Sequence, residues 1–183
     1  MRLFIGLMPD DYVREELARY SASLQSRYTA RYVTPDLYHL TLAFLGEREE
    51  ISLPKIRLLL SRVAAQTMPF TLSLAGMGTF GHAGTAIAYA AVTLPDELQA
   101  LDECLRSALS EEGEPFDDKP LLPHITLARK AALIADDLPA GPLPLSFQVN
   151  SLVLYHSTRV SGILRYLPIF TIPMGLPFQE EHI

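Results

Sequence analysis

The distribution of apolar residues along the chain predicts a mixture of strands and helices. Short alternating or apolar runs predict strands over residues 2–8, 39–45, 70–80, 85–94, 124–129, 147–155 and 163–172. Apolar residues at a spacing of three or four predict helices over 10–27, over 52–66 and after Pro95, the last carrying Leu98, Leu101, Leu105 and Leu109. Such a mixture is typical of an α+β protein.

One stretch of sequence occurs twice. Residues 39–43, His-Leu-Thr-Leu-Ala, return as residues 124–128, His-Ile-Thr-Leu-Ala, at a distance of 85 residues. Before each copy the sequence predicts a strand and then a helix, which begins near Pro9 or Pro95. Strand, helix and His-Thr strand therefore recur in the same order, which a chance match would not produce.

The repeat predicts a single domain over 1–183 made of two pseudo-symmetric lobes. The repeat units cover about 1–46 and 85–129. Residues 136–144, with three prolines and a glycine, are expected to form a connector. The charged run 47–50 is expected to be a solvated turn, and the tail from Gly175, with His182, to be loose chain without a function.

Both His-Thr strands are expected to present one polar and one apolar face. Successive side chains of an extended chain point to opposite faces. Strict alternation puts on one face His39, Thr41 and Ala43 of the first strand, and His124, Thr126 and Ala128 of the second. The residues between them are expected to pack into a core, namely Leu40, Leu42, Phe44, Ile125 and Leu127. Each strand thus offers an imidazole and a hydroxyl to a cleft.

Two imidazoles and two hydroxyls in one cleft suit acid-base chemistry at phosphorus without a metal. Because the unperturbed pKa of imidazole is about 6.5, one ring can deprotonate the attacking oxygen while the other protonates the leaving oxygen. The threonine hydroxyls can donate to the non-bridging phosphoryl oxygens. Two other interpretations are a structural histidine, which the repetition disfavours, and a metal site, which the lack of a Cys or carboxylate within the motifs disfavours.

Composition narrows the class of protein. The formal net charge of −6 argues against a protein that coats long nucleic acid, but it leaves room for one phosphorylated substrate. The single cysteine, Cys104, excludes an internal disulfide and is expected to be a core residue in a reducing, cytoplasmic setting. No apolar run approaches the roughly 18 residues of a membrane span, and residues 1–8 are expected to form a strand rather than a signal peptide.

The sequence resembles the two-histidine phosphoesterases, and within them the RNA 2′,3′-cyclic phosphodiesterases, historically named 2′-5′ RNA ligases. The resemblance covers almost the whole chain and is carried by residues 2–5, HLTLAFLG at 39–46, PHITLAR at 123–129, and 152–155 followed by Gly162 and Tyr166. It implies a bilobal α+β fold with antiparallel sheets facing a central cleft and helices outside. It also implies an enzyme that hydrolyses a terminal 2′,3′-cyclic phosphate to a 2′-phosphate, without a cofactor.

The resemblance also implies roles for individual residues. His39 resembles the general acid that protonates the 3′ leaving oxygen, and His124 the general base that activates water, although the pseudo-symmetry makes this assignment reversible. Thr41 and Thr126 take the phosphate-binding role. Arg129 ends the PHITLAR string and would contact phosphate, but strict alternation puts it on the Ile125 face, so a bulge is required; otherwise it is a solvated arginine. The expected partners are RNA with a cyclic phosphate end or a small cyclic nucleotide, bound by a monomer with no membrane attachment.

Departures from the family pattern leave alternatives open. The chain has no Trp, and Ala43, Leu37 and Leu122 stand where the family commonly has a Lys, an Asn and a basic residue. A non-catalytic domain that binds RNA ends or nucleotides therefore remains an alternative, as does reversible 2′-5′ RNA ligation. His156 is a further candidate near the cleft mouth, and four aromatic residues are candidates for stacking on a base, namely Tyr28, Tyr32, Phe80 and Tyr89.

Overall fold

The computed structural model describes residues 1–133, 138–141 and 144–177. These residues form α1 (Asp11–Gln25), α2 (Leu53–Ala65) and α3 (Asp96–Glu111). Their strands are β1 (Arg2–Leu7), β2 (Arg31–Tyr32), β3 (Leu40–Glu47), β4 (Phe70–Phe80), β5 (Ala86–Val92), β6 (His124–Ala131), β7 (Ser146–Val149), β8 (Ser151–Val160) and β9 (Ile163–Pro173). The predicted α+β class is confirmed. Part of the predicted connector and the end of the tail, including His182, lie outside the described residues.

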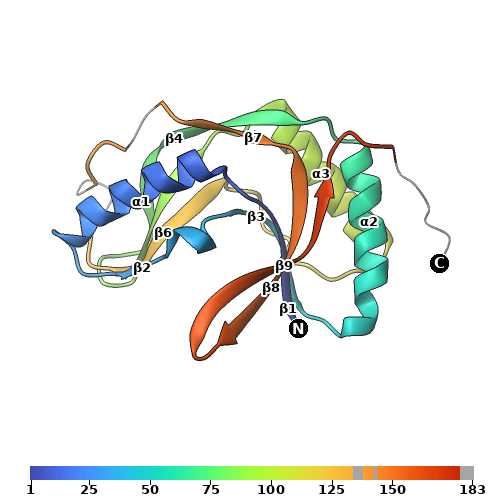
Figure 1. Ribbon diagram of the computed structural model, residues 1–183, viewed down its shortest axis with the longest axis horizontal. Coiled ribbons are helices and arrows are strands. Elements are labelled where there is room, and N and C mark those ends of the chain that lie inside the picture. The colour runs from blue at the N-terminus through green and yellow to red at the C-terminus, as the bar shows by residue number, and fades with distance from the viewer. Residues whose placement is uncertain (134–137, 142–143, 178–183) are drawn as a thin grey trace.

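The strands join into one curved antiparallel sheet (Figure 1). Its order is β7-β4-β5-β6-β3-β1-β8-β9, and β2 also pairs with β6. Four strands belong to each side of the contact between β6 and β3, where Leu40 pairs with Ile125. Each repeat unit therefore supplies two neighbouring antiparallel strands, β1 with β3 and β5 with β6. The first lobe contains β3, β1, β8 and β9, and the second lobe contains β6, β5, β4 and β7. The two lobes meet at the His-Thr strands.

The strand predicted over 147–155 is in fact two strands. Residues 146–149 pair with β4 in the second lobe, whereas residues 153–156 pair with β1 in the first. The chain crosses between the lobes at Asn150, whose carbonyl accepts a hydrogen bond from the Met174 amide. Because both strands carry buried apolar residues at a spacing typical of a strand, the sequence pattern alone does not show this break.

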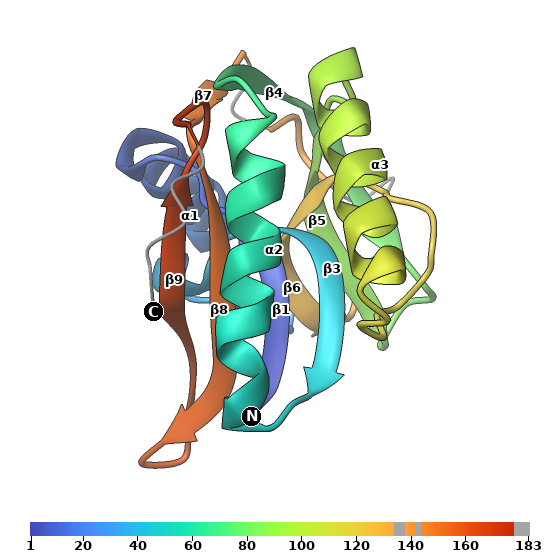
Figure 2. The same ribbon diagram turned by 90° about the vertical axis from the view of Figure 1, so that its right-hand side faces the viewer.

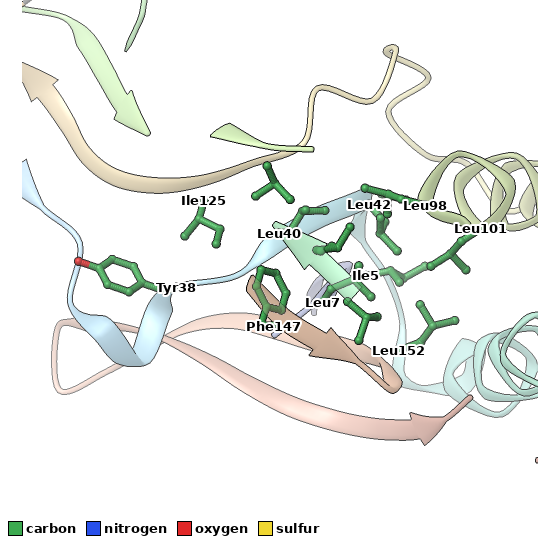
Figure 3. Close-up of a cluster of buried hydrophobic side chains, with 14 of the residues drawn as sticks. Ile5, Leu7, Tyr38, Leu40, Leu42, Leu98, Leu101, Ile125, Phe147 and Leu152 are labelled. Atoms are coloured by element: carbon green, nitrogen blue, oxygen red, sulfur yellow. The ribbon is translucent and has the colours of Figure 1, made fainter. Parts of the chain in front are cut away.

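The helices cover one face of the sheet. Their apolar stripes recur at three- and four-residue spacing and belong to a single buried cluster with residues of β1, β3 and β6. Figure 3 shows Leu40 and Ile125 in this cluster, and α2 packs beside α3 in Figure 2. Burying each leucine contributes about 2 kcal/mol. Among the described residues, no helix covers the opposite face of β3 and β6.

A β-bulge interrupts each His-Thr strand directly after its threonine. Ile5 pairs with Ala43 and Gly6 with Thr41, so Leu42 is extra in β3. Tyr89 pairs with Thr126 and Ala88 with Ala128, so Leu127 is extra in β6. The faces predicted for three residues were therefore wrong, because alternation assumes an unbroken ladder. Ala43 and Ala128 lie in the core, and Phe44 is 44% exposed.

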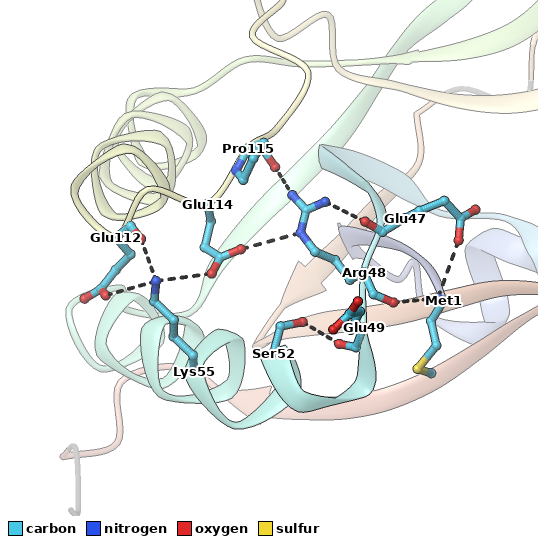
Figure 4. Close-up of polar contacts among 9 residues, drawn as sticks. All are labelled: Met1, Glu47, Arg48, Glu49, Ser52, Lys55, Glu112, Glu114 and Pro115. Atoms are coloured by element: carbon cyan, nitrogen blue, oxygen red, sulfur yellow. Dashed lines mark hydrogen bonds and ion pairs between the residues drawn. The ribbon is translucent and has the colours of Figure 1, made fainter.

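The charged run 47–50 does more than solvate a turn. In Figure 4, Arg48 donates to the carbonyl oxygens of Glu47 and Pro115 and faces the Glu114 carboxylate at 3.5 Å. Lys55 reaches the same carboxylate at 3.3 Å. The Arg48 and Glu114 side chains are only 14% and 10% exposed, which weakens solvent screening. This ionic brace ties the end of β3 and the start of α2 to the segment after α3.

Candidate active site

The contact between β3 and β6 brings the four predicted catalytic and phosphate-binding residues together. Continuing the register of Leu40 with Ile125 puts His39 opposite Thr126, and Thr41 opposite His124. Directly opposed residues of antiparallel strands share a face. The residues next to these four in the two strands, Leu40 and Ile125, are fully buried in the core on the other face. The two histidines and two threonines therefore project from the face that the helices leave open.

Main-chain carbonyls orient both imidazoles. His39 Nδ1 lies 2.7 Å from the Leu37 carbonyl oxygen, and His124 Nδ1 lies 2.6 Å from that of Leu122. A carbonyl oxygen only accepts hydrogen bonds, so Nδ1 carries the proton and each neutral ring has its lone pair on Nε2. The departures from the family pattern at positions 37 and 122 leave this orientation intact, because the main chain supplies it.

Thr41 contacts the other ring nitrogen of His39. Its Oγ1 lies 3.0 Å from His39 Nε2. Since Nε2 of the neutral ring is an acceptor, the Thr41 hydroxyl donates to it. A change in the protonation of His39 therefore changes what the Thr41 hydroxyl can bind.

The surroundings of His39 keep its ring neutral. Burial lowers the pKa of His39 from 6.5 to about 4, and electrostatic interactions with Arg129 and with His124 act in the same direction. The hydrogen bond to Leu37 opposes this shift only in part. The burial comes from aromatic rings, since the ring centroids of Phe4 and Tyr166 lie 4.8 and 4.9 Å from that of the imidazole.

His124 also lies against aromatic rings. The centroids of Phe80 and Tyr89 are 5.1 and 5.5 Å from its ring, and the two aromatics stack on each other at 4.1 Å. Gly78 makes room for Tyr89, since a Cβ there would lie 2.6 Å from the Tyr89 hydroxyl oxygen. Two of the predicted stacking candidates thus lie beside the site.

The other candidates lie elsewhere. Tyr28 and Tyr32 pack against the buried clusters. His156 pairs with Leu3, a core residue, so it belongs to the helix-covered face and not to the site. Sequence reasoning missed Phe4, Tyr155 and Tyr166 beside His39, although the unbroken apolar run in β1 is typical of a strand covered on both faces.

The bulge in β6 turns Arg129 onto the histidine face. Leu127 and Ala128 are both buried, and the next residue, Arg129, is exposed. Its charge contributes to the low pKa of His39, which places it near that ring. The bulge that the predicted role of Arg129 requires is therefore present. Sequence reasoning missed Arg31, which pairs directly with Arg129.

Two classes of feature are missing from the described part of the chain. Residues 1–133, 138–141 and 144–177 contain no group of three or more His, Cys, Asp or Glu side chains that could hold a metal ion. Among the same residues, no helix is both long and apolar enough to cross a membrane.

Comparison with known proteins identifies the family of the chain. Residues 9–160 match the sequence model of the 2′-5′ RNA ligase superfamily. The RNA 2′,3′-cyclic phosphodiesterase of Thermus thermophilus is 33% identical over 100% of this chain and 92% of its own length. That of Escherichia coli K12 is 30% identical, over 92% of this chain and 93% of the relative. The chain belongs to the 2′-5′ RNA ligase superfamily.

Solved structures show the same fold. Escherichia coli LigT complexed with 3′-AMP superposes with a TM-score of 0.83 at 29% identity, covering 96% of this chain and 98% of that one. A crystal structure of a protein from Thermus thermophilus gives a TM-score of 0.82 at 30% identity, with the same coverage. The likeness extends over both lobes.

Proposed function

We propose that the chain hydrolyses terminal 2′,3′-cyclic phosphates of RNA, or of small cyclic nucleotides, to 2′-phosphates by acid-base catalysis that needs no metal. The observation that carries this proposal is the cross-strand arrangement of His39, Thr41, His124 and Thr126 on one open face. Relatives at about 30% identity that are named RNA 2′,3′-cyclic phosphodiesterases support the reaction class.

In the proposed reaction the two Nε2 atoms act on opposite sides of phosphorus. His124 Nε2 accepts a proton from water, whose oxygen attacks phosphorus. The bond from phosphorus to the 3′ oxygen breaks, and His39 donates its Nε2 proton to that oxygen, which leaves a 2′-phosphate. The threonine hydroxyls donate to the non-bridging oxygens, where negative charge increases.

Substrate binding prepares His39 for its role as the acid. In the free protein the ring is neutral, because burial and the nearby positive charge of Arg129 hold its pKa at about 4. An anionic phosphate beside the ring opposes that charge and raises this pKa. Once Nε2 carries a proton it no longer accepts from Thr41, so the Thr41 hydroxyl is free to donate to the phosphate.

Hydrolysis in the presence of EDTA tests the proposal. The substrates are the four nucleoside 2′,3′-cyclic monophosphates and a short RNA with a cyclic end. We expect wild type to release 2′-phosphates, and His39→Ala and His124→Ala each to lose at least about 10²-fold in kcat. The matched control is His156→Ala, which removes a histidine from the opposite face and should keep activity.

Other outcomes would contradict the proposal in distinguishable ways. Full activity of either site variant, or activity abolished by EDTA and restored by a divalent metal, would refute metal-free histidine catalysis. Tight binding of every substrate without turnover would instead support a binding domain. Joining of RNA ends at excess product strand would show the reverse, ligation reaction.

A leaving group that needs no proton separates the acid from the base. We expect His39→Ala to lose much less activity on a nucleoside 4-nitrophenyl phosphodiester than on the cyclic phosphate, whereas His124→Ala loses activity on both. The opposite result would reverse the two roles, which the pseudo-symmetry of the site allows.

A further inference from the structure

Two arginines lie directly opposite each other on the histidine face. In the pairing of β2 with β6, Arg31 is opposite Arg129 and Tyr32 is opposite Ala128. Ala128 is fully buried and Tyr32 packs against the same buried cluster, so the neighbouring arginines project from the other face. Like charges in directly opposed positions repel and destabilise a sheet.

No carboxylate in the described part of the chain compensates this pair. Within the described ranges, neither Arg31 nor Arg129 forms an ion pair or a side-chain hydrogen bond, whereas Arg14, Arg106 and Arg165 each pair with an aspartate. The chain carries 21 acidic and 15 basic residues, so carboxylates are plentiful. The two guanidinium groups therefore form a local positive site suited to an anion.

The arginine pair lies at the His39 end of the active site. The order along β6 is His124, Thr126 and Arg129, and Thr126 is the residue opposite His39. Because the bulge takes up one residue, Arg129 is about two strand steps, or ~7 Å, beyond Thr126. Arg129 lowers the pKa of His39 electrostatically, which agrees with a position near that ring.

The inference drawn from this position rests on the proposed function. His39 protonates the 3′ oxygen, so the terminal nucleoside is bound on the His39 side of the scissile phosphate. The next phosphate of an RNA strand is attached to the 5′ oxygen of that same nucleoside. We propose that Arg31 and Arg129 bind this 5′-side phosphodiester, so that the chain prefers RNA ends to free nucleoside 2′,3′-cyclic phosphates.

Paired substrates test the preference. One is a nucleoside 2′,3′-cyclic phosphate with a free 5′-hydroxyl, and the other is a dinucleotide that ends in the same cyclic nucleotide. We expect wild type to show a kcat/KM about tenfold higher for the dinucleotide, mainly through KM, as for one charged hydrogen-bonded contact. Arg31→Gln should remove most of this advantage and leave kcat/KM for the mononucleoside substrate unchanged. Arg19→Gln, an exposed arginine of α1, is the matched control and should behave as wild type.

Salt dependence gives a readout that a structural role would not change. For wild type, log kcat/KM should fall with the logarithm of the salt concentration more steeply for the dinucleotide than for the mononucleoside. The two slopes should differ by about 0.7 per phosphate contact, and Arg31→Gln should remove this difference. Affinities for the matching 2′-phosphate products test the same preference without turnover.

An equal kcat/KM of wild type for the dinucleotide and the mononucleoside would overturn the inference. An equal loss of kcat/KM for both substrates in Arg31→Gln would also overturn it. Absence of turnover in wild type would contradict the proposed function alone, since product affinities still report on the arginines.

Discussion

The burial of His39 should make the stability of the fold depend on pH in a defined window. The ring has a pKa of 6.5 in the unfolded chain and about 4 in the folded protein. Between these values the unfolded chain binds more protons, so the free energy of unfolding falls as the pH falls. From pH 7 to pH 5 this single residue accounts for a loss of about 2 kcal/mol.

Urea unfolding of wild type and His39→Gln at pH 7 and pH 5 measures this loss. The other titrating groups are common to both proteins and cancel in the comparison. When the pH is lowered from 7 to 5, we expect the free energy of unfolding to fall by about 2 kcal/mol less in His39→Gln than in wild type. An NMR titration of the His39 ring gives the pKa independently. The same pH dependence in both proteins, or a ring that titrates near 6.5, would refute the reasoning.

Three further substitutions test the packing beside the two histidines and the ionic brace at the end of β3. Gly78→Ala puts a methyl group where the Tyr89 hydroxyl lies, so hydrolysis should fall while the melting temperature changes little; unchanged kcat and KM would contradict this role for Gly78. Gly6→Ala puts a Cβ 2.7 Å from the Leu40 carbonyl oxygen, beside His39, and should destabilise the fold by about 1–3 kcal/mol in urea unfolding. Arg48→Met removes the centre of the ionic brace and should cost about 1.5–3 kcal/mol, against Arg62→Met as a more exposed control; equal losses in the two variants would assign no special role to the brace.

The sequence predicts those features that depend on periodicity and repetition. Helices and strands follow from the apolar spacing, and the repeated His-Thr motif identifies four residues that the register of β3 with β6 then brings together. A histidine and a threonine two residues apart were enough to predict that their side chains lie on the same face, because the local geometry of an extended chain fixes which side chains share a face.

The features that sequence reasoning missed depend on pairing between distant strands. The bulges after Thr41 and Thr126 arise from the ladders with β1 and β5, and alternation within one strand cannot show them. Arg31 becomes informative only when it is opposite Arg129. The break at Asn150 likewise exists because the chain changes its neighbour there.

The order in which strands enter the sheet has a consequence for biosynthesis. The second lobe, β4 to β7, is one continuous stretch, residues 70–149, whereas the first lobe combines β1 and β3 with β8 and β9. A chain growing on the ribosome can therefore complete the second lobe first. Tyr155 and Tyr166 reach Phe4 and His39 only after β9 has been made. The enclosure that keeps His39 neutral is thus expected to form last, when synthesis of the chain is nearly finished.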